Sequence, residues 1–493
     1  MNIRLFSQLG IISALLQGCF AAHSPKVSSY QDMSASLARD AFLEPETGHP
    51  SGRESVRMAS APGDETLGAP TENTSGGSSP PDLELTWLLE QVQLQNQSLR
   101  AAYFRWLAAS EKTAQIPALP EPRLSYGVFL RSVETRVGPQ RQRFGISQMI
   151  PWPAMTGARR NKAALDAEIE FLHFSKMRLD IRRQTARQFH ELYFVDRAIE
   201  NARSSLELDR SLVGVVESRA RAGSSISDLL KIQTRISMES NRLDSLIAMR
   251  KALLKSLNAR LGDMDILPED ISTDEIIVDP AIIDQIQGNR HLIADNNVDL
   301  RINRLKEEGA WVAREISRLD SYPNLMVGVD YIETGPAVMA GVPDSGKDPV
   351  MVSASIEIPL NRRQYQSAIR ESDRRLDAIQ SDSRQSQLDI EAALAMVSFR
   401  LNDAMDKILL FDESVLPDVS ETLGISEQRY RSGELSIDRL IDDRKKYIEI
   451  TLLKHRAVAD LGIQISEFDF LSGGTASFSG LGNVQIHNSH DEP

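Results

Sequence analysis

Two short strings in this sequence place acids and histidines at a spacing that could bind a metal ion. Glu170 and His173 lie three residues apart in "EFLH", so a helix would present both side chains on one face. The string "HNSHDE" near the end of the chain brings His487, His490 and Asp491 together. A helical carboxylate–histidine site needs similar pairs on neighbouring helices, and none is evident. We therefore expect an ordinary solvated helix face, a disordered tail and no metal.

Covalent catalysis is not indicated in the chain. Serine-bearing strings such as "GRESVRMAS" lack the histidine or aspartate context that would activate a nucleophile. A glycine-rich phosphate-binding loop is also missing, so the chain is not expected to fuel transport itself. Its 69 acidic residues outnumber its 56 basic ones, which argues against a nucleic-acid surface. The sequence predicts a protein that is not an enzyme, needs no cofactor and binds no nucleic acid.

The single cysteine, Cys19, excludes an internal disulfide and stands where a lipid would be attached. Residues 1–18 are typical of a secretory signal, with the basic Arg4 followed by an apolar run too short to span a bilayer. The string "LQGC" then resembles a lipobox, which predicts acylation of Cys19. The alternative is an ordinary signal peptide followed by a chance cysteine. Phe20, in place of an aspartate, favours the outer membrane.

Two segments have no apolar periodicity. Residues 19–81 are rich in Ser, Pro, Gly and Ala, and residues 471–493 have a similar composition. Such composition cannot bury enough apolar surface to fold. The sequence predicts a disordered tether at the start, a disordered tail at the end, and a folded part between residues 82 and 470.

The folded part contains two copies of one plan. The strings "RARAGSSISDLL" (219–230) and "RYRSGELSIDRL" (429–440) have Arg, Arg, Gly, Asp and Leu at the same places. A period of roughly 205 residues is too long for a solenoid, so we infer the duplication of one large unit. The two repeats are expected at residues 82–262 and 281–470, with a linker segment at 263–280.

Each repeat predicts a very long helix, a glycine turn and a second helix. From Gly157 to Gly223 the chain has no proline and only Gly214 as a further glycine. A helix of about 68 residues is on the order of 100 Å long and must be paired along its length. Near-heptad Leu and Ile residues from 229 to 261 indicate a coiled-coil seam, and Gly223 and Gly433 allow each chain reversal. The predicted helices span ~155–222, ~225–262, ~361–431 and ~435–468, with Pro417 kinking the third.

Four short segments alternate between apolar and small or polar residues. In "VMVSASIEI", Val350, Val352 and Ile356 point one way, while Ser353 and Ser355 point the other. This alternation is typical of a transmembrane barrel strand and also of a soluble sandwich strand. The predicted strands span ~123–131, ~142–150, where Gln148 interrupts the apolar face, ~324–332 and ~349–358.

The connections between strands and helices favour the membrane interpretation. Each junction carries a proline, which ends one backbone conformation and begins another, so helices are expected to continue in line from strands. A sheet in lipid must close on itself, and four strands cannot enclose a lumen. The chain must therefore form an oligomer. Two chains would give eight strands, and three would give twelve with an aqueous lumen.

With these features the chain resembles the TolC-type outer-membrane efflux factors, in particular the lipoprotein kind that serves resistance-nodulation-division pumps. The resemblance rests on "LPEPRLSYG", "QMIPWP…GARR", "VLPDVSETL" and the two glycine strings, and it covers roughly residues 82–470. It implies a mainly α-helical homotrimer, with a twelve-stranded β-barrel in the outer membrane above a twelve-helix periplasmic α-barrel. Residues 263–280 would lie in a belt around the α-barrel.

The resemblance also implies roles for the two glycine turns. They would be the periplasmic ends of two helical hairpins, where a periplasmic adaptor (membrane fusion) protein docks on Gly223, Gly433, Arg221 and Arg431. Closing the rim of these tips would close the channel.

Acidic residues just past the second turn form the inner ring of the closed end in the family. Here Asp438, Asp442 and Arg439 stand near that place, and Asp228 holds the place equivalent to Asp438 in the first repeat. We expect Asp438, with Asp442, to line an acidic constriction that favours cations, with Arg439 able to neutralise it. The alternative is an exposed acid stabilised by a helix N-terminus.

These features predict an outer-membrane exit duct that passively conducts substrates from an inner-membrane resistance-nodulation-division pump and its adaptor to the exterior. One alternative is the outer-membrane channel of a type I protein secretion system. Another is a periplasmic coiled-coil scaffold without a pore. The sequence does not distinguish a metal-ion substrate from a drug.

Overall fold

Four long antiparallel strands form the sheet of the protein in the computed structural model, which describes residues 83–474 except 117–118, 132, 222–225 and 289–292. All of the described residues belong to the unit Ser79–Pro493. The predicted signal peptide, Cys19, the tether, Gly223 and the histidines of the tail lie outside the described residues.

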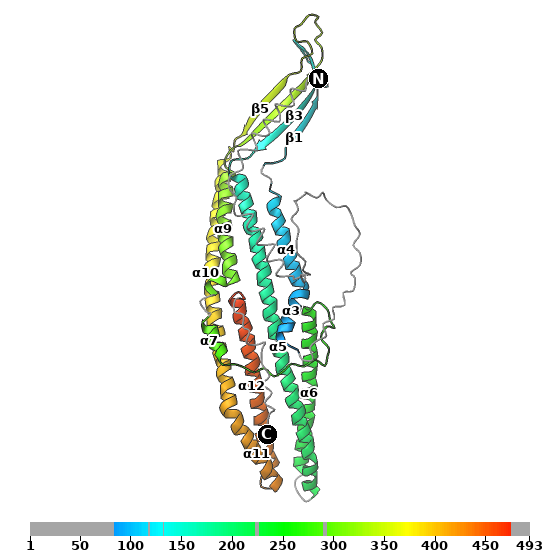
Figure 1. Ribbon diagram of the computed structural model, residues 1–493, viewed down its shortest axis with the longest axis vertical. Coiled ribbons are helices and arrows are strands. Elements are labelled where there is room, and N and C mark those ends of the chain that lie inside the picture. The colour runs from blue at the N-terminus through cyan, green and yellow to red at the C-terminus, as the bar shows by residue number, and fades with distance from the viewer. Residues whose placement is uncertain (1–82, 117–118, 132, 222–225, 289–292, 475–493) are drawn as a thin grey trace, which may run out of the picture. The chain divides into compact units, whose positions relative to one another are not determined.

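The strands follow one another across the sheet in the order β1-β3-β4-β5 (Figure 1). A two-residue strand, β2, pairs with the start of β3 and was not predicted, because two residues show no periodicity. The β3 strand begins four residues before the predicted range, since its first residues pair with β2 and, past a bulge, with β4. The bounds are β1 Arg123–Val128, β2 Glu134–Thr135, β3 Gly138–Ile150, β4 Asn324–Thr334 and β5 Val350–Glu357.

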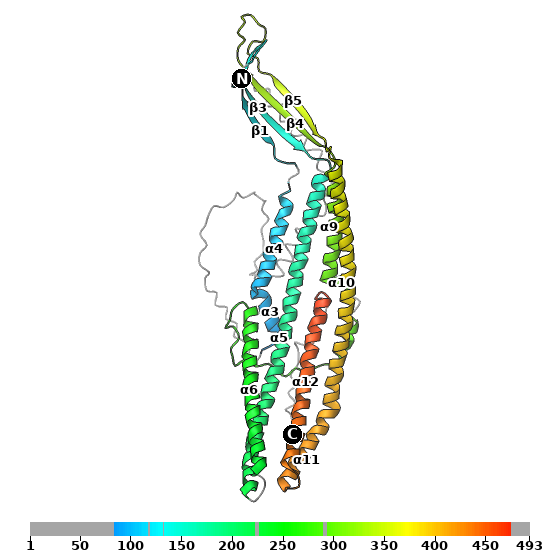
Figure 2. The same cartoon turned by 180° about the vertical axis from the view of Figure 1, so that it is seen from behind.

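The remaining elements are helices, most of them very long. The 67-residue helix α5 packs against α4, α6, α9 and α12, and Figures 1 and 2 show α6 and α12 beside it. No helix in the described ranges has an apolar stretch long enough to cross a membrane. The bounds are α3 Leu85–Gln95, α4 Gln97–Ala114, α5 Met155–Arg221, α6 Ile226–Arg260, α7 Ala281–Gly288, α8 Ile293–Asn296, α9 Val298–Leu319, α10 Arg362–Leu410, α11 Leu416–Ser432 and α12 Ile437–Leu471.

The long helix predicted at ~361–431 is not continuous. The α-helix α10 ends at Leu410, a π-helical turn covers Phe411–Val415, and α11 follows. Pro417 lies in the first turn of α11, where it lacks an N–H group and its ring would clash with the carbonyl of Glu413. The wider turn relieves this clash, so the predicted kink takes the form of a π-helical insertion.

The helices enclose several apolar cores. One joins α5, α7, α10 and α12, and another joins α3, α4, α5 and α6. Leu267 and Ile271, in the predicted linker 263–280, are buried in the second core, and the N–H of Leu83 donates to the carbonyl of Ser272. The predicted tail begins too early, because α12 continues to Leu471, whose side chain is buried in the first core.

Candidate functional sites in the sheet and at the hairpin tips

Strand pairing separates the sheet into two chemically different faces. Residues directly opposite each other in an antiparallel pair lie on the same face, so each row across the sheet belongs to one side. One face is apolar and largely exposed: Leu124 is 82 % exposed and Val352 is 78 % exposed. This face carries Leu124, Tyr126, Phe144, Ile146, Ile150, Leu325, Val327, Val329, Tyr331, Val350, Val352 and Ile356.

The opposite face is mostly small or polar. One row contains Arg123, Ser147, Gly328 and Ser353, and the next contains Ser125, Gly145, Asp330 and Met351. The observed pairing therefore brings the four alternating segments into one two-faced sheet.

Gln148 is the polar residue that interrupts the apolar pattern, and it lies near the helical end of β3. Its side-chain amide donates to the carbonyl oxygens of Pro120, at 2.6 Å, and Met149, at 3.0 Å. The proline-rich segment before β1 thus accepts a hydrogen bond from the Gln148 amide, at the end of the sheet that leads into the helices.

Aromatic side chains flank the apolar face. At the helical end the rings of Trp152 and Tyr322 stack with centroids 4.8 Å apart. At the other end the rings of Tyr126 and Phe144 lie 5.1 Å apart, and Tyr331 is directly opposite Phe144. Aromatic rings at both borders of an apolar band are typical of sheets that meet two membrane–water interfaces.

The outer strands of the sheet each have one open edge. Among the described strands, β1 pairs only with β3 and β5 pairs only with β4. Every residue of β1 and most residues of β5 are exposed. Open edges beside an exposed apolar face leave this sheet unfinished within a single chain.

The turn between α11 and α12 ends in a left-handed glycine. Gly433 has φ 87°, its N–H donates to Tyr430 O, and the N–H of Glu434 donates to Arg429 O. This pair of bonds is a Schellman motif, in which glycine avoids the Cβ strain of other residues. Arg431 is exposed beside the turn, and Arg221, at the end of α5, is exposed with Glu217 at 3.6 Å.

Lys231 connects the two hairpins close to their turns, and sequence reasoning missed it. Its Nζ lies 2.8 Å from both carboxylate oxygens of Asp438 on α12 and 3.9 Å from Asp228 on its own helix α6. The hydrogen bond to Asp438 is the main cause that raises the pKa of Lys231. The only sequence signal for the pair Lys231–Asp228 is its spacing of three residues.

The other predicted gate residues are separated from this group. Arg439 faces Asp443, with 3.4 Å between Nε and Oδ2, and does not pair with Asp438. Asp443 is buried and accepts a hydrogen bond from Ser426 Oγ at 2.7 Å. Asp442 is exposed on α12. The structure thus brings Asp228 and Asp438 together around Lys231 and places Arg439 and Asp442 apart from them.

A buried charge network joins four helices farther from the turns. Asp209 on α5 accepts a hydrogen bond from Arg235 Nε of α6 at 2.7 Å and lies 3.6 Å from Arg444 Nη1 of α12. Arg444 also bonds Glu427 of α11 at 3.0 Å. Sequence reasoning missed these residues because their pairing depends on tertiary packing. They hold the two hairpins against each other, together with an apolar cluster that includes Val216, Tyr430, Ile437 and Leu440.

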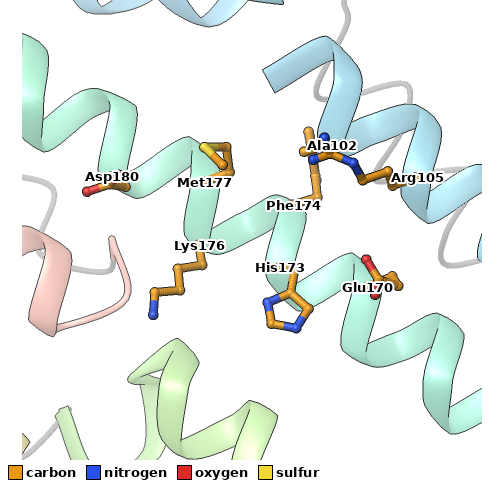
Figure 3. Close-up of a pocket in the computed structure, with 8 residues that line it drawn as sticks. All are labelled: Ala102, Arg105, Glu170, His173, Phe174, Lys176, Met177 and Asp180. Atoms are coloured by element: carbon orange, nitrogen blue, oxygen red, sulfur yellow. The ribbon is translucent and has the colours of Figure 1, made fainter. Parts of the chain in front are cut away.

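Glu170 and His173, the pair with metal-site spacing, line a cavity of about 390 Å³ between α4 and α5 (Figure 3). Figure 3 shows their side chains together with Arg105, Lys176 and Asp180. Lys176 is paired with Asp299 at 2.6 Å. Within the described ranges no group of acidic, His or Cys side chains is arranged to hold a metal ion.

Comparison with solved structures identifies the fold. VceC from Vibrio cholerae, an outer membrane protein, matches with a TM-score of 0.66 and 15% sequence identity, over 79% of this chain and 96% of its own. The outer membrane channel CmeC from Campylobacter jejuni matches with a TM-score of 0.64 and 12% identity, over 88% of this chain and 95% of its own. The outer-membrane channel OprN matches with a TM-score of 0.65 and 15% identity, over 79% and 90%.

The sequence comparisons give no further relatives: no family model matches the chain, and no curated protein sequence is significantly similar to it. The structural matches show that the chain has the fold of TolC-type outer-membrane channels, which confirms the mainly α-helical chain with a sheet that the resemblance implies. The trimer and its two barrels stay predictions.

Proposed function

We propose that this protein is the outer-membrane exit duct of a tripartite efflux system, working as a homotrimer without chemistry of its own. The observation that carries the proposal is the unfinished sheet, apolar on one face, polar on the other and open at both edges. The similar structures OprN and CmeC are outer-membrane channels, which supports the same location and role here.

The sheet accounts for the membrane part of the duct. In a bilayer an open edge leaves backbone N–H and C=O groups without partners, so β1 and β5 must pair with strands of other copies. Three copies supply twelve long strands, enough for an aqueous lumen, whereas two copies would supply eight and a filled interior. The apolar face then meets lipid and the polar face lines the lumen.

The helices also expose apolar side chains. Ile226 and Met238 on α6 are 69 % and 70 % exposed, and Leu388 and Phe399 on α10 are 60 % and 65 % exposed. Such residues along a long helix are typical of a coiled-coil partner face. In the trimer α6 of one copy would pack near α10 of the next and close a twelve-helix α-barrel in the periplasm.

The hairpin turns would form the periplasmic gate. Gly223, Gly433, Arg221 and Arg431 would meet the adaptor protein, which in turn binds an inner-membrane pump. The proposed gate differs from the one that the sequence predicts. The positive charge beside Asp438 comes from Lys231 and not from Arg439. We propose that separation of Lys231 from Asp438 accompanies dilation of the rim, as a population shift between closed and open states.

Acylation of Cys19 would add a lipid anchor in the outer membrane. Each buried CH₂ group of such a chain contributes about 0.8 kcal/mol to membrane binding. The anchor would supplement the barrel, so Cys19→Ser should leave the channel itself intact.

Reconstitution tests the proposed function. The full-length protein, inserted into planar bilayers, should give discrete conductance steps, and cells that lack it should become more sensitive to small toxic compounds. A protein that inserts or binds without conductance would contradict the proposal and favour a scaffold. Normal sensitivity, with loss of a secreted protein, would favour a type I secretion channel.

A further inference from the structure

One charged pair stands out on the polar face of the sheet. Arg143 on β3 donates two parallel hydrogen bonds to Asp330 on β4, from Nε to Oδ1 at 3.0 Å and from Nη2 to Oδ2 at 2.9 Å. This two-bond fork is the strongest geometry available to an arginine and a carboxylate. Neither residue is needed to close the sheet or to form the hairpin turns.

A glycine makes room for the pair. Asp330 lies directly opposite Gly145 on β3, and Gly145 lies directly opposite Ser125 on β1. A Cβ atom at position 145 would collide with Asp330 Oδ1 and Ser125 Oγ. The Asp330 carboxylate therefore lies against the sheet over the glycine.

The two partners differ in exposure. The Asp330 side chain is 8 % exposed, whereas the Arg143 side chain is 47 % exposed. A solute that passes this face meets the guanidinium group, with the carboxylate beneath it. Arg123 and Glu357, also charged and on this face, lie nearer the helical end, and Arg141 lies two residues before Arg143 at the bulge of β3.

The position of the pair on the sheet determines which side of a barrel it faces. Charged side chains in a membrane-spanning sheet are costly against lipid and are tolerated in the lumen. The face opposite Arg143 and Asp330 is the apolar one, so in a closed barrel the pair faces inward. A trimer would place three copies at one level of the lumen.

We propose that Arg143 and Asp330 form a charge-balanced ring that sets the ion selectivity of the barrel lumen, an inference that rests on the proposed function as a trimeric pore. In the trimer each Asp330 neutralises the guanidinium group of one Arg143, and the three guanidinium groups would otherwise attract anions and repel cations. Removing either partner therefore leaves three unbalanced charges of one sign at this level.

The test is a double-mutant cycle on reversal potential, measured in planar bilayers across a KCl gradient. Asp330→Asn leaves Arg143 unbalanced and should shift the K⁺/Cl⁻ permeability ratio toward Cl⁻. Arg143→Gln should shift it toward K⁺, and the double variant should return close to wild type. Each shift should be about two- to fourfold near 0.1 M salt and smaller at 1 M, because the charges act through water over roughly one Debye length.

Two further variants separate charge from structure. Arg143→Lys keeps the charge and loses the fork, so it should keep wild-type selectivity while lowering the temperature of unfolding. Glu333→Gln removes a negative charge from the opposite side of the same strand as Asp330, so it should not shift the reversal potential toward Cl⁻ as Asp330→Asn does.

The outcomes distinguish this inference from the proposed function. If the wild-type protein forms no channel, the proposed function fails. If it forms channels whose selectivity is unchanged in Asp330→Asn, or shifts in the same direction in both single variants, the charge-balanced ring is wrong. Should Arg143→Gln fail to fold, Asp330→Asn and the double variant still decide.

Discussion

Lys231 connects the two hairpins close to their turns. It binds Asp438 across the hairpins and lies near Asp228 on its own helix, so it links residues that the sequence predicts only as an acidic group. The pair is exposed to solvent, so its effect on overall stability is small and its effect on the position of the tips is the quantity to measure.

Substitution of Lys231 should release the closed tips. We expect Lys231→Gln and Asp438→Asn each to raise the mean single-channel conductance or the open fraction, because each removes the cross-hairpin ion pair. Asp418→Asn is the matched control, since Asp418 is exposed on α11 and lies outside the predicted gate. Equal conductance in Lys231→Gln and wild type, in recordings made at the same low salt, would show that the ion pair does not control the gate.

His190 should make stability depend on pH. Burial lowers its pKa to about 4, and neither ring nitrogen has a hydrogen-bond partner among the described residues. An unfolded chain binds the proton near pH 6.5, so the folded state is penalised as pH falls from 6.5 toward 4. The free energy of unfolding should fall by up to about 1.4 kcal/mol per pH unit in that window.

Thermal unfolding of the detergent-solubilised protein between pH 7.5 and 5 measures this effect. His190→Leu should flatten the acid side of the profile, whereas the same change at the exposed His173 should not. Burial also lowers the pKa of His455, so a residual slope of the same sign is expected. An unchanged slope in His190→Leu would show that other groups control the acid sensitivity.

The crossing of α5 and α12 depends on a glycine in a helix. A Cβ atom at Gly462 would collide with the imidazole ring of His190, so the two helices approach closely only because this side chain is missing. Gly424 on α11 offers the opposite situation, because a Cβ atom there would meet nothing within 4 Å.

The two glycines predict opposite effects of the same substitution. Gly462→Ala should destabilise the protein by about 1–3 kcal/mol through overpacking. Gly424→Ala should be neutral or stabilising by about 0.5–1 kcal/mol, because alanine is the better helix former. Unfolding in denaturant measures both, and a destabilisation by Gly424→Ala equal to that of Gly462→Ala would contradict the packing argument.

Local sequence signals predict some kinds of element better than others. Strands and long helices were found because alternation, as at Val350 to Ile356, and glycine-free runs are local signals. The π-helical turn at Phe411–Val415 was missed because the sequence near Pro417 predicts a kink without showing how the backbone absorbs it. The short helix break at Asn96, whose side chain caps α4, was not anticipated either.

The candidate sites could be predicted from the sequence only in part. The apolar and polar faces could be predicted, since each follows from one strand alone. The pairs Lys231–Asp438 and Arg143–Asp330 join residues 207 and 187 positions apart, and no local pattern connects them. The network around Asp209 was missed for the same reason, because it forms only where four helices meet.

We propose that the whole molecule works as part of an assembly. Among the described residues, β1 and β5 each have one edge without a paired strand, and α6 and α10 expose apolar side chains. A single chain that exposes this much apolar surface would aggregate or find partners. Copies of the same chain would pair the open strand edges and cover the exposed apolar side chains at the same time. Cyclic symmetry would make every copy equivalent.

The mass of the mature protein in mild detergent, measured by native mass spectrometry, tests this account most directly. The account predicts a single assembly of three chains that also conducts ions after transfer to a bilayer. A folded, monodisperse monomer that forms no pore would contradict it.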